Sequence, residues 1–198
     1  MDNSLTELGL TPEQMLAEVA PFVDKIHVLA GEIGLDLVDL QADHIALRIN
    51  QHSLAEQAHQ AWLDYGEVIS SAQINGRPII VYQFTSPIVI GCWQIECLEL
   101  PYPAVGKVYP QQGWEHIEFV IPSNATTADD FLQELMNKFP LMNKRWHALE
   151  EQGVKTKLSS PKGEGERLAN PTVAFKKSGV CIKLHPHSLK NVVLSESE

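Results

Sequence analysis

The residues best suited to chemistry in this chain are two histidines at matching positions of two similar segments. Residues 43–49 read DHIALRI and residues 115–121 read EHIEFVI, so each histidine follows an acidic residue and precedes an isoleucine. In both segments apolar residues alternate with the others, which is typical of a strand with one buried face. His44 and His116 then project from the opposite face. Their equivalent positions in a repeat predict that both point into one shared site.

A carboxylate in a later segment is the third candidate for this site. Residues 91–100 are a predicted strand, and alternation places Glu99 on the same face as Trp93 and Cys97. A carboxylate among apolar neighbours is costly to bury unless it is paired or binds a metal ion. Two imidazoles and one carboxylate form a ligand set that leaves open positions on a divalent ion such as Fe, Mn, Zn or Ni. The alternative is that each histidine is a structural residue satisfied by hydrogen bonds.

Charged residues on the same strand faces add further candidates. The last predicted strand places Lys183 and His185 on one face, so either of them can join the set. Arg48 and Glu118 share the inward faces of the two histidine-bearing strands and can form an ion pair there. Glu118 is also a candidate general base, because it lies two residues from His116 on the same face.

The predicted elements occur twice in the order β-α-β-β-β. Module one, residues 40–103, and module two, residues 113–187, follow an N-terminal helical extension, residues 1–39, and precede a tail, residues 188–198, in which residues 191–198 are expected to be frayed. The predicted strands are 42–49, 68–74, 78–84 and 91–100 in module one and 115–121, 154–158, 171–176 and 180–185 in module two, with helices at 53–65 and 127–139. We therefore expect an α+β fold whose two modules form a cleft, with an extra N-terminal helix.

Local signals support several of these boundaries. Thr11, Pro12 and Gln14 form a strong start signal for the N-terminal helix, because threonine can cap it and glutamine can complete a capping box. Pro21 is expected to kink or divide this helix, and Gly34 is expected to end it. The dipeptide formed by residues 75 and 76, NG, predicts a hairpin between two strands of module one.

Composition narrows the class of protein. The formal net charge is −10, from 25 acidic and 15 basic residues, which disfavours a nucleic-acid partner. The N-terminus lacks the features of a signal peptide, and no apolar run approaches the ~18 residues of a membrane span, so a cytoplasmic protein without a membrane partner is expected. The 3 cysteines lack a zinc-type spacing, and Cys92 and Cys97 are predicted to be small buried hydrophobes.

The motifs also resemble known families. Residues 43–48 (DHIALR), residues 114–118 (WEHIE) and the twofold β-α-β-β-β order are similar to the vicinal-oxygen-chelate superfamily of glyoxalase I and the extradiol dioxygenases. More closely, four segments between positions 40 and 187 resemble the bacterial YecM family: residues 74–79 (INGRPI), 113–118 (GWEHIE), 159–164 (SSPKGE) and 170–172 (NPT). That family carries no activity that can be transferred to this chain.

The superfamily resemblance implies a metal site built from the first and last strands of each module. Its ligand positions fall on His44, Glu99, His116 and Lys183. A protonated lysine has no lone pair, so either three residues bind the metal or His185 supplies a fourth ligand. The implied function is that of a divalent-metal-dependent isomerase, lyase or oxidoreductase, whose metal accepts two neighbouring oxygens of a small oxygen-rich molecule.

The alternative is a non-catalytic module of the same fold that binds a small anion without a metal. It would hold the anion through Arg48, Lys183 and Arg167, the last of these in a polar loop of module two. In either case the expected partner is a small-molecule ligand. The sequence leaves the oligomeric state open, a homodimer included.

Overall fold

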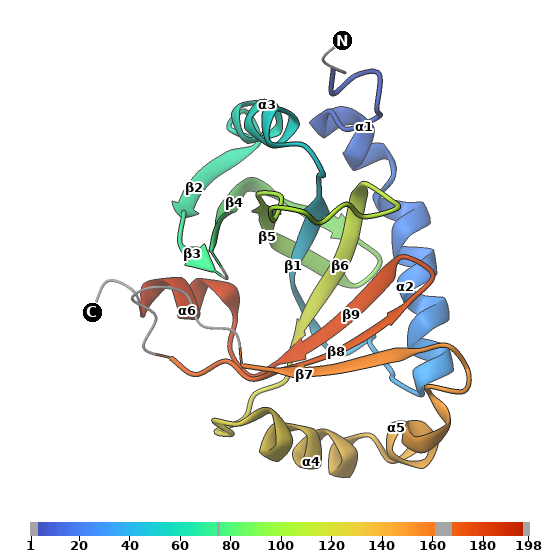
Figure 1. Cartoon of the computed structure of the whole chain (residues 1–198). Helices are drawn as coiled ribbons and strands as arrows, with labels where there is room; N and C mark the ends of the chain where they lie inside the picture. Colours follow the sequence, from blue (N-terminus) through green and yellow to red (C-terminus); the bar gives the residue numbers. More distant parts are fainter. Residues whose placement is uncertain (1–3, 75, 161–167, 196–198) are drawn as a thin grey trace.

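The computed structural model describes residues 4–74, 76–160 and 168–195 of the 198-residue chain. It has the predicted α+β fold, in which helices pack against one large twisted sheet (Figure 1). The strands are β1 (Gln41–Arg48), β2 (Gly66–Ser70), β3 (Gln73–Ile74), β4 (Arg77–Ile90), β5 (Trp93–Pro101), β6 (Gly113–Val120), β7 (Lys155–Ser159), β8 (Thr172–Lys177) and β9 (Val180–His185). The helices are α1 (Pro12–Ala17), α2 (Val19–Ile33), α3 (His52–Trp62), α4 (Ala128–Lys138), α5 (Pro140–Arg145), the 3₁₀ turn η1 (Trp146–Ala148) and α6 (Leu189–Leu194).

The sheet joins the two modules along their first strands. Its order is β2-β4-β5-β1-β6-β9-β8-β7, with β3 paired to β4 outside this path. In each module the first strand is parallel to the last, β1 to β5 and β6 to β9, and β1 runs antiparallel to β6 at the centre. The four strands that carry the candidate ligands are therefore neighbours in the middle of the sheet.

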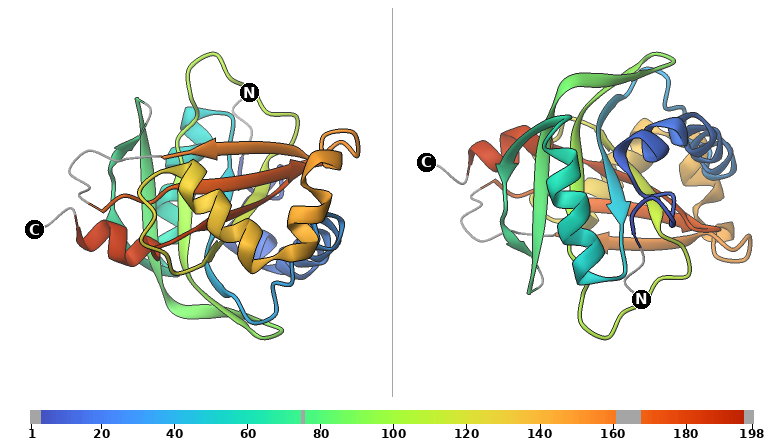
Figure 2. Two further views of the ribbon diagram at one scale, coloured as in Figure 1. Left: turned by 90° about the horizontal axis from the view of Figure 1, so that it is seen from below. Right: turned by 90° about the horizontal axis from the view of Figure 1, so that it is seen from above.

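The two faces of this sheet have different environments. Ile45 and Leu47 of β1 and Ile117 and Phe119 of β6 belong to one large apolar core, as the sequence predicts. Helix α2 packs on β6 and β9, α3 on β5, and α4 on β7 and β8, so these helices cover the core face. The intervening residues point to the other side, which we call the inner face. Figure 2 shows α6 beside the strands of module one, at the opposite end of the molecule from α2 and α5.

The N-terminal helical segment begins and ends as predicted. Thr11 accepts a hydrogen bond from the Gln14 amide, and the Gln14 side chain accepts one from the Thr11 amide, which completes the capping box. The segment divides at Glu18, so that Pro21 lies in the first turn of α2. A proline there lacks only an N–H that has no partner inside the helix. The Pro21 prediction is therefore confirmed as a division of the helix.

Substituting Gly34 is expected to destabilise the fold. Gly34 ends α2 with φ +88°, and an added Cβ would lie 2.8 Å from Leu141 Cγ. Gly34→Ala should lower the free energy of unfolding by about 1–3 kcal/mol in urea titrations. Gly31→Ala is the matched control, because a Cβ at Gly31 has no neighbour within 4 Å and alanine favours a helix by about 0.5–1 kcal/mol. Equal stability of the two variants would contradict this account.

Three details differ from the sequence-based expectations. The expected fraying of residues 191–198 is wrong for the first part of that segment, because α6 continues to Leu194 and Val192 is buried. Strand β4 continues to Ile90 beyond its predicted end, because its far half still pairs with β5. Cys92 is exposed in the turn between β4 and β5, whereas Cys97 is buried as expected. Within the described part of the chain, no helix has the length and apolarity that a bilayer span requires.

Candidate metal centre

Each of the two histidines follows an acidic residue that sits in a β-bulge. Between Ala42 and His44, β1 advances two residues while β6 advances one, so Asp43 is the extra residue. In β6 the extra residue is Glu115, between Trp114 and His116. A bulge breaks the strict alternation of faces. Both acids are thereby turned toward the histidine that follows them instead of into the core.

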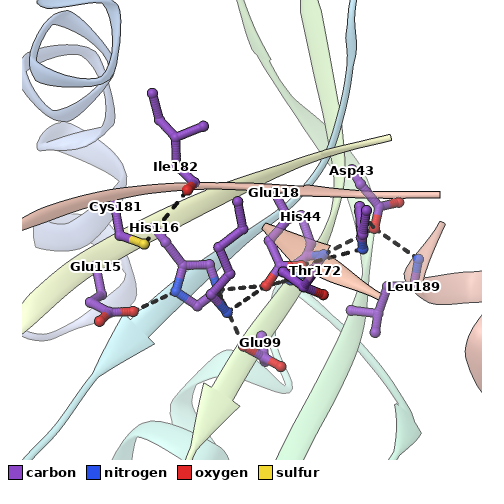
Figure 3. Close-up of polar contacts among 12 residues, drawn as sticks. Asp43, His44, Glu99, Glu115, His116, Glu118, Thr172, Cys181, Ile182 and Leu189 are labelled. Atoms are coloured by element: carbon purple, nitrogen blue, oxygen red, sulfur yellow. Dashed lines mark hydrogen bonds and ion pairs between the residues drawn. The ribbon is translucent and has the colours of Figure 1, made fainter. Parts of the chain in front are cut away.

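The bulged acids fix the orientation of the two imidazoles. Asp43 Oδ2 lies 3.0 Å from His44 Nδ1, and Glu115 Oε2 makes a short contact with His116 Nδ1. In Figure 3 these acids flank the cluster at its two ends, and the imidazoles lie between them. A carboxylate on Nδ1 directs the Nε2 lone pair toward the centre, as it does for many metal-binding histidines. The acid-His dipeptide repeated in the sequence thus supplies both a ligand and its orienting group.

Two further carboxylates meet the Nε2 atoms on the inner face. Glu118 Oε1 lies 3.4 Å from His44 Nε2 and 3.1 Å from His116 Nε2. Glu99 Oε2 lies 3.4 Å from His116 Nε2. One ligand atom from each of these four residues lies within 4.8 Å of all the others. Neighbouring ligands of one ion with bonds of about 2.1 Å are separated by roughly 3.0–3.4 Å, and the three contacts between the imidazoles and these carboxylates fit that spacing.

One buried atom has no hydrogen-bond partner in this cluster. His44 is only 2% exposed, and its Nε2 atom is inaccessible to solvent and makes no hydrogen bond to any described residue. A buried polar atom without a partner is uncommon and indicates a missing water, ion or ligand. Apart from its 3.4 Å ion-pair contact with Glu118 Oε1, His44 Nε2 thus has no hydrogen-bond partner among the described residues, at a position where a metal ligand is expected.

Lys183 lies among the same groups. Its Nζ donates to Glu118 Oε1 at 2.6 Å and is 3.1 Å from His116 Nε2. Burial lowers the pKa of Lys183, but the charges of Glu118 and Glu99 outweigh burial and raise it above the ordinary value. A charged ammonium therefore contacts two of the four candidate ligands, and a metal ion must compete with it.

In this cluster, neighbouring charges and hydrogen bonds oppose the effect of burial on the pKa of each residue. Burial opposes the protonation of both histidines, but the Glu118 charge and the hydrogen bond to Asp43 raise the pKa of His44 to about 10. Burial and Lys183 lower the pKa of His116, and the surrounding carboxylates raise it to about 9. Burial raises the pKa of Glu99, yet the hydrogen bond to His116 and the Lys183 charge lower it to about 2. A metal ion that binds here must therefore displace protons.

Two candidate residues have other partners than the sequence suggested. His185 Nε2 lies 3.5 Å from Asp43 Oδ2, and its Nδ1 lies 3.1 Å from the Asn170 side-chain amide. The Asn170 amide nitrogen also donates to the His187 carbonyl, which fixes its orientation toward His185. His185 therefore groups with Asp43 and His44 rather than with Glu99 and His116, and its Nδ1 also lies 3.3 Å from Glu118 Oε2.

Arg48 is on the inner face but does not pair with Glu118. Its Nη2 lies 3.0 Å from Glu115 Oε1, and its guanidinium carbon lies 4.2 Å from the centre of the Tyr109 ring. Nε and Nη1 of Arg48 are buried without a hydrogen-bond partner among the described residues. Arg167, the third candidate anion-binding residue, lies outside the described residues.

The alternation in β5 shifts by one residue before it reaches Glu99. Trp93 and Ile95 belong to the core, but so do Leu98 and Leu100, which leaves Cys97 and Glu99 on the inner face. The sequence-based grouping of Glu99 with Trp93 was therefore wrong, although it placed Glu99 toward the site. A cavity of about 20 Å³ borders Glu99, whereas a larger hollow of about 370 Å³ lies beside α2 and contains none of the cluster residues.

Comparison with known proteins identifies the family. A family model described as YecM protein matches residues 11–196. Protein YecM of Escherichia coli (strain K12) is 36% identical over 184 residues, which cover 93% of each chain. The chain belongs to the YecM family. A second YecM-like relative, an uncharacterized protein of Haemophilus influenzae (strain ATCC 51907 / DSM 11121 / KW20 / Rd), is 33% identical over 191 residues, covering 94% of this chain and 95% of its own.

A solved structure has the same fold as this YecM-family chain. It is described as Structural Genomics, Protein EC4020, is 32% identical, and superposes with a TM-score of 0.76 over 99% of this chain and 97% of its own. The names of these relatives state no reaction. The chemistry of the YecM-family chain must therefore be argued from its own side chains.

Sequence reasoning missed the orienting roles of Asp43 and Glu115. The signal that reveals them is an acidic residue directly before each histidine, at a position where strict alternation points into the core. Sequence reasoning also treated Glu118 as a general base, whereas in the structure it is one of the four residues that could hold a metal ion. Burial raises the pKa of Glu118, but Lys183 and His44 lower it well below the ordinary value, which makes it a weak base.

Proposed function

We propose that this chain binds a divalent metal ion through His44, Glu99, His116 and Glu118. The observation that carries the proposal is the convergence of these four ligand atoms, together with the buried Nε2 of His44, which makes no hydrogen bond and lies 3.4 Å from Glu118 Oε1. The mixed nitrogen and oxygen set suits Fe, Mn, Zn or Ni and does not select one of them. Lys183 contacts Glu118 and His116, so in the free protein its ammonium group competes with a metal ion for these two ligands.

The proposed activity is that of a metal-dependent isomerase, lyase or oxidoreductase acting on a small oxygen-rich molecule. A bound metal ion would polarise two neighbouring substrate oxygens and stabilise negative charge that develops on them. Asp43 and Glu115 hold the two imidazoles in place. Once a metal ion has displaced Lys183 from Glu118, the lysine ammonium would be free to pair with the substrate, so an anionic substrate is favoured.

Elemental analysis of protein purified without an affinity tag tests this proposal first. The expected result is close to one equivalent of a transition metal per chain, removed by a chelator and restored by Mn²⁺ or Zn²⁺. Titration calorimetry of the metal-free protein should then give one site per chain. The absence of any transition metal in the purified protein, together with no heat of binding, would overturn the proposal.

Glu115→Gln is expected to weaken metal binding by about 10- to 100-fold. A glutamine amide can donate to His116 Nδ1, which would move the ring proton to Nε2 and remove the lone pair needed for a metal ion. The matched control is Glu96→Gln, which changes a carboxylate of β5 that is half exposed and bonded to Lys190. Calorimetric titration of Mn²⁺ into both variants measures the difference. Equal affinities in the two variants would show that Glu115 does not orient a ligand.

A second candidate function is metal-free binding of a small anion. Two observations favour it: the Lys183 ammonium already contacts two candidate ligands, and two nitrogens of Arg48 are buried without partners. In that case Lys183 would replace the metal ion as the positive charge at the centre. The two candidates differ in their response to substitution of Lys183.

A further inference from the structure

The C-terminal helix α6 covers part of the inner face next to the candidate metal centre. It is the next element after β9 and begins at Leu189, with Ser188 as its N-cap, and the Leu189 amide donates to Asp43 Oδ2 at 2.8 Å. Figure 3 shows this contact at the end of the cluster opposite to Glu115. The helix is therefore tied to the same carboxylate that orients His44.

The inner face under α6 is apolar as well as charged. Among the residues that the structure describes, seven buried apolar ones do not belong to the main core, and they lie on the inner strands and on α6: Ala46, Ile79, Val81, Cys97, Val120, Cys181 and Val192. Helices α2, α3 and α4 pack on the other face of the sheet, so they do not cover this set. An apolar surface next to a polar cluster of ligands is typical of a small-molecule site.

Side chains of α6 line a small cavity beside Glu99. The cavity there has a volume of about 20 Å³, room for about one water molecule. Its walls are Ser70, Ala72, Ile74, Ile79 and Val81 from the β2–β4 side, Glu99 from β5, and Leu189 and Val193 from α6. Two aliphatic side chains of α6 thus occupy the apolar wall that meets a candidate ligand.

Five of the six side chains of α6 are at least partly exposed to solvent. The helix has six residues, and Val192 is its one buried side chain. Lys190 pairs with Glu96 at 2.6 Å, but both side chains are at least 30% exposed, and exposed pairs contribute little. Ser195 accepts a hydrogen bond from the Leu168 amide at 3.3 Å. A short terminal helix with such contacts belongs to the parts of a fold that open most readily.

We propose that the space now filled by Leu189 and Val193 is the binding site for an aliphatic group of the substrate, and that α6 moves aside when the substrate binds. The substrate class is an aliphatic 2-oxo acid: its two neighbouring oxygens would bind the metal ion held by the four-residue cluster, its negative charge would face Lys183, and its side chain would enter the apolar space. The oxygen contacts rest on the proposed metal function, whereas the apolar site does not.

The test compares 4-methyl-2-oxopentanoate, whose side chain equals that of leucine, with pyruvate, whose side chain is one methyl group. Affinities are measured by calorimetry with Mn²⁺ and again in a chelator. The variant is Leu189→Ala combined with Val193→Ala. Leu194→Ala is the matched control, because Leu194 is on the same helix but is 64% exposed.

The double variant is expected to increase the preference for the longer acid over pyruvate by at least about tenfold, because its side chain no longer displaces Leu189 and Val193. Leu194→Ala should keep the wild-type preference. In the wild type, hydrogen exchange of the amides in 189–195 should become faster at saturation with the longer acid and stay unchanged with pyruvate. This second measurement requires no substitution.

Three results would overturn the inference: the same preference in the double variant and in Leu194→Ala, unchanged exchange in α6 at saturation, or no binding of the longer acid to any form. An unchanged affinity on addition of Mn²⁺ would not by itself overturn the inference about the apolar site. If the preference persists in chelator and Mn²⁺ changes nothing, the apolar site stands and the proposed metal function fails.

Discussion

Replacing His116 with alanine is expected to abolish divalent-metal binding. The affinity should fall by more than about 100-fold, because losing a group that only orients a ligand already costs about 10- to 100-fold. The substitution removes an Nε2 atom that lies within 3.4 Å of both Glu99 and Glu118. Calorimetric titration with Mn²⁺ and elemental analysis of the purified variant measure the effect. His44→Ala should behave in the same way.

The same substitution should also destabilise the metal-free protein. His116 is only 2% exposed, so its loss leaves Glu99, Glu115 and Glu118 with fewer positive partners inside the protein. Removing one member of a buried charged group costs about 3–5 kcal/mol. The control is His52→Ala, which removes an imidazole that is 65% exposed on α3 and should change neither metal binding nor thermal unfolding. Unchanged metal stoichiometry in both His44→Ala and His116→Ala would place the site elsewhere.

Lys183→Met is expected to strengthen metal binding, on the order of 100-fold, because it removes a positive charge from the ligand cluster. The metal-free variant should lose stability, since Glu118 loses its 2.6 Å partner. Added Mn²⁺ should restore thermal stability, because a ligand that binds only the folded state stabilises it. Calorimetry and thermal unfolding with and without Mn²⁺ measure both effects.

Lys177→Met is the matched control for Lys183. Lys177 also pairs with a glutamate, Glu32, at 2.7 Å, but on the far side of the sheet next to α2. The comparison separates the two candidate functions. If the wild type binds no metal and Lys183→Met does, the chain is an anion-binding module that has lost its metal site. If neither binds metal, the four-ligand cluster is a structural network of charges.

The repeated part of the fold could be predicted from the sequence because it depends on local patterns. Alternating residues in 43–49 and 115–121 identify two strands, and their similarity identifies the repeat. With the same element order in both modules, equivalent strands must occupy equivalent places. This is why His44 and His116 could be expected to face each other, and their ring centres are 5.9 Å apart.

The remaining features depend on tertiary contacts that no local pattern reveals. The shift in β5 that separates Glu99 from Trp93 requires knowledge of its pairing with β4. The pairing of Lys183 with Glu118 depends on the parallel register of β6 and β9. Helix α6 is too short for a helical period to show, and it is held by Asp43, more than a hundred residues earlier in the chain.

The bulges at Asp43 and Glu115 each add one residue to the strand that carries a histidine, so the alternation of side chains between the two faces skips that residue. Ala42 and His44 are two positions apart, yet Ala42 belongs to the core and His44 to the inner face. A one-residue deletion at 43 would restore strict alternation and force one of these side chains onto the wrong face. Insertions and deletions in this family should therefore avoid the acid-His dipeptides. An acidic residue at a core-facing position directly before a histidine can serve as a marker for such bulges in other strands.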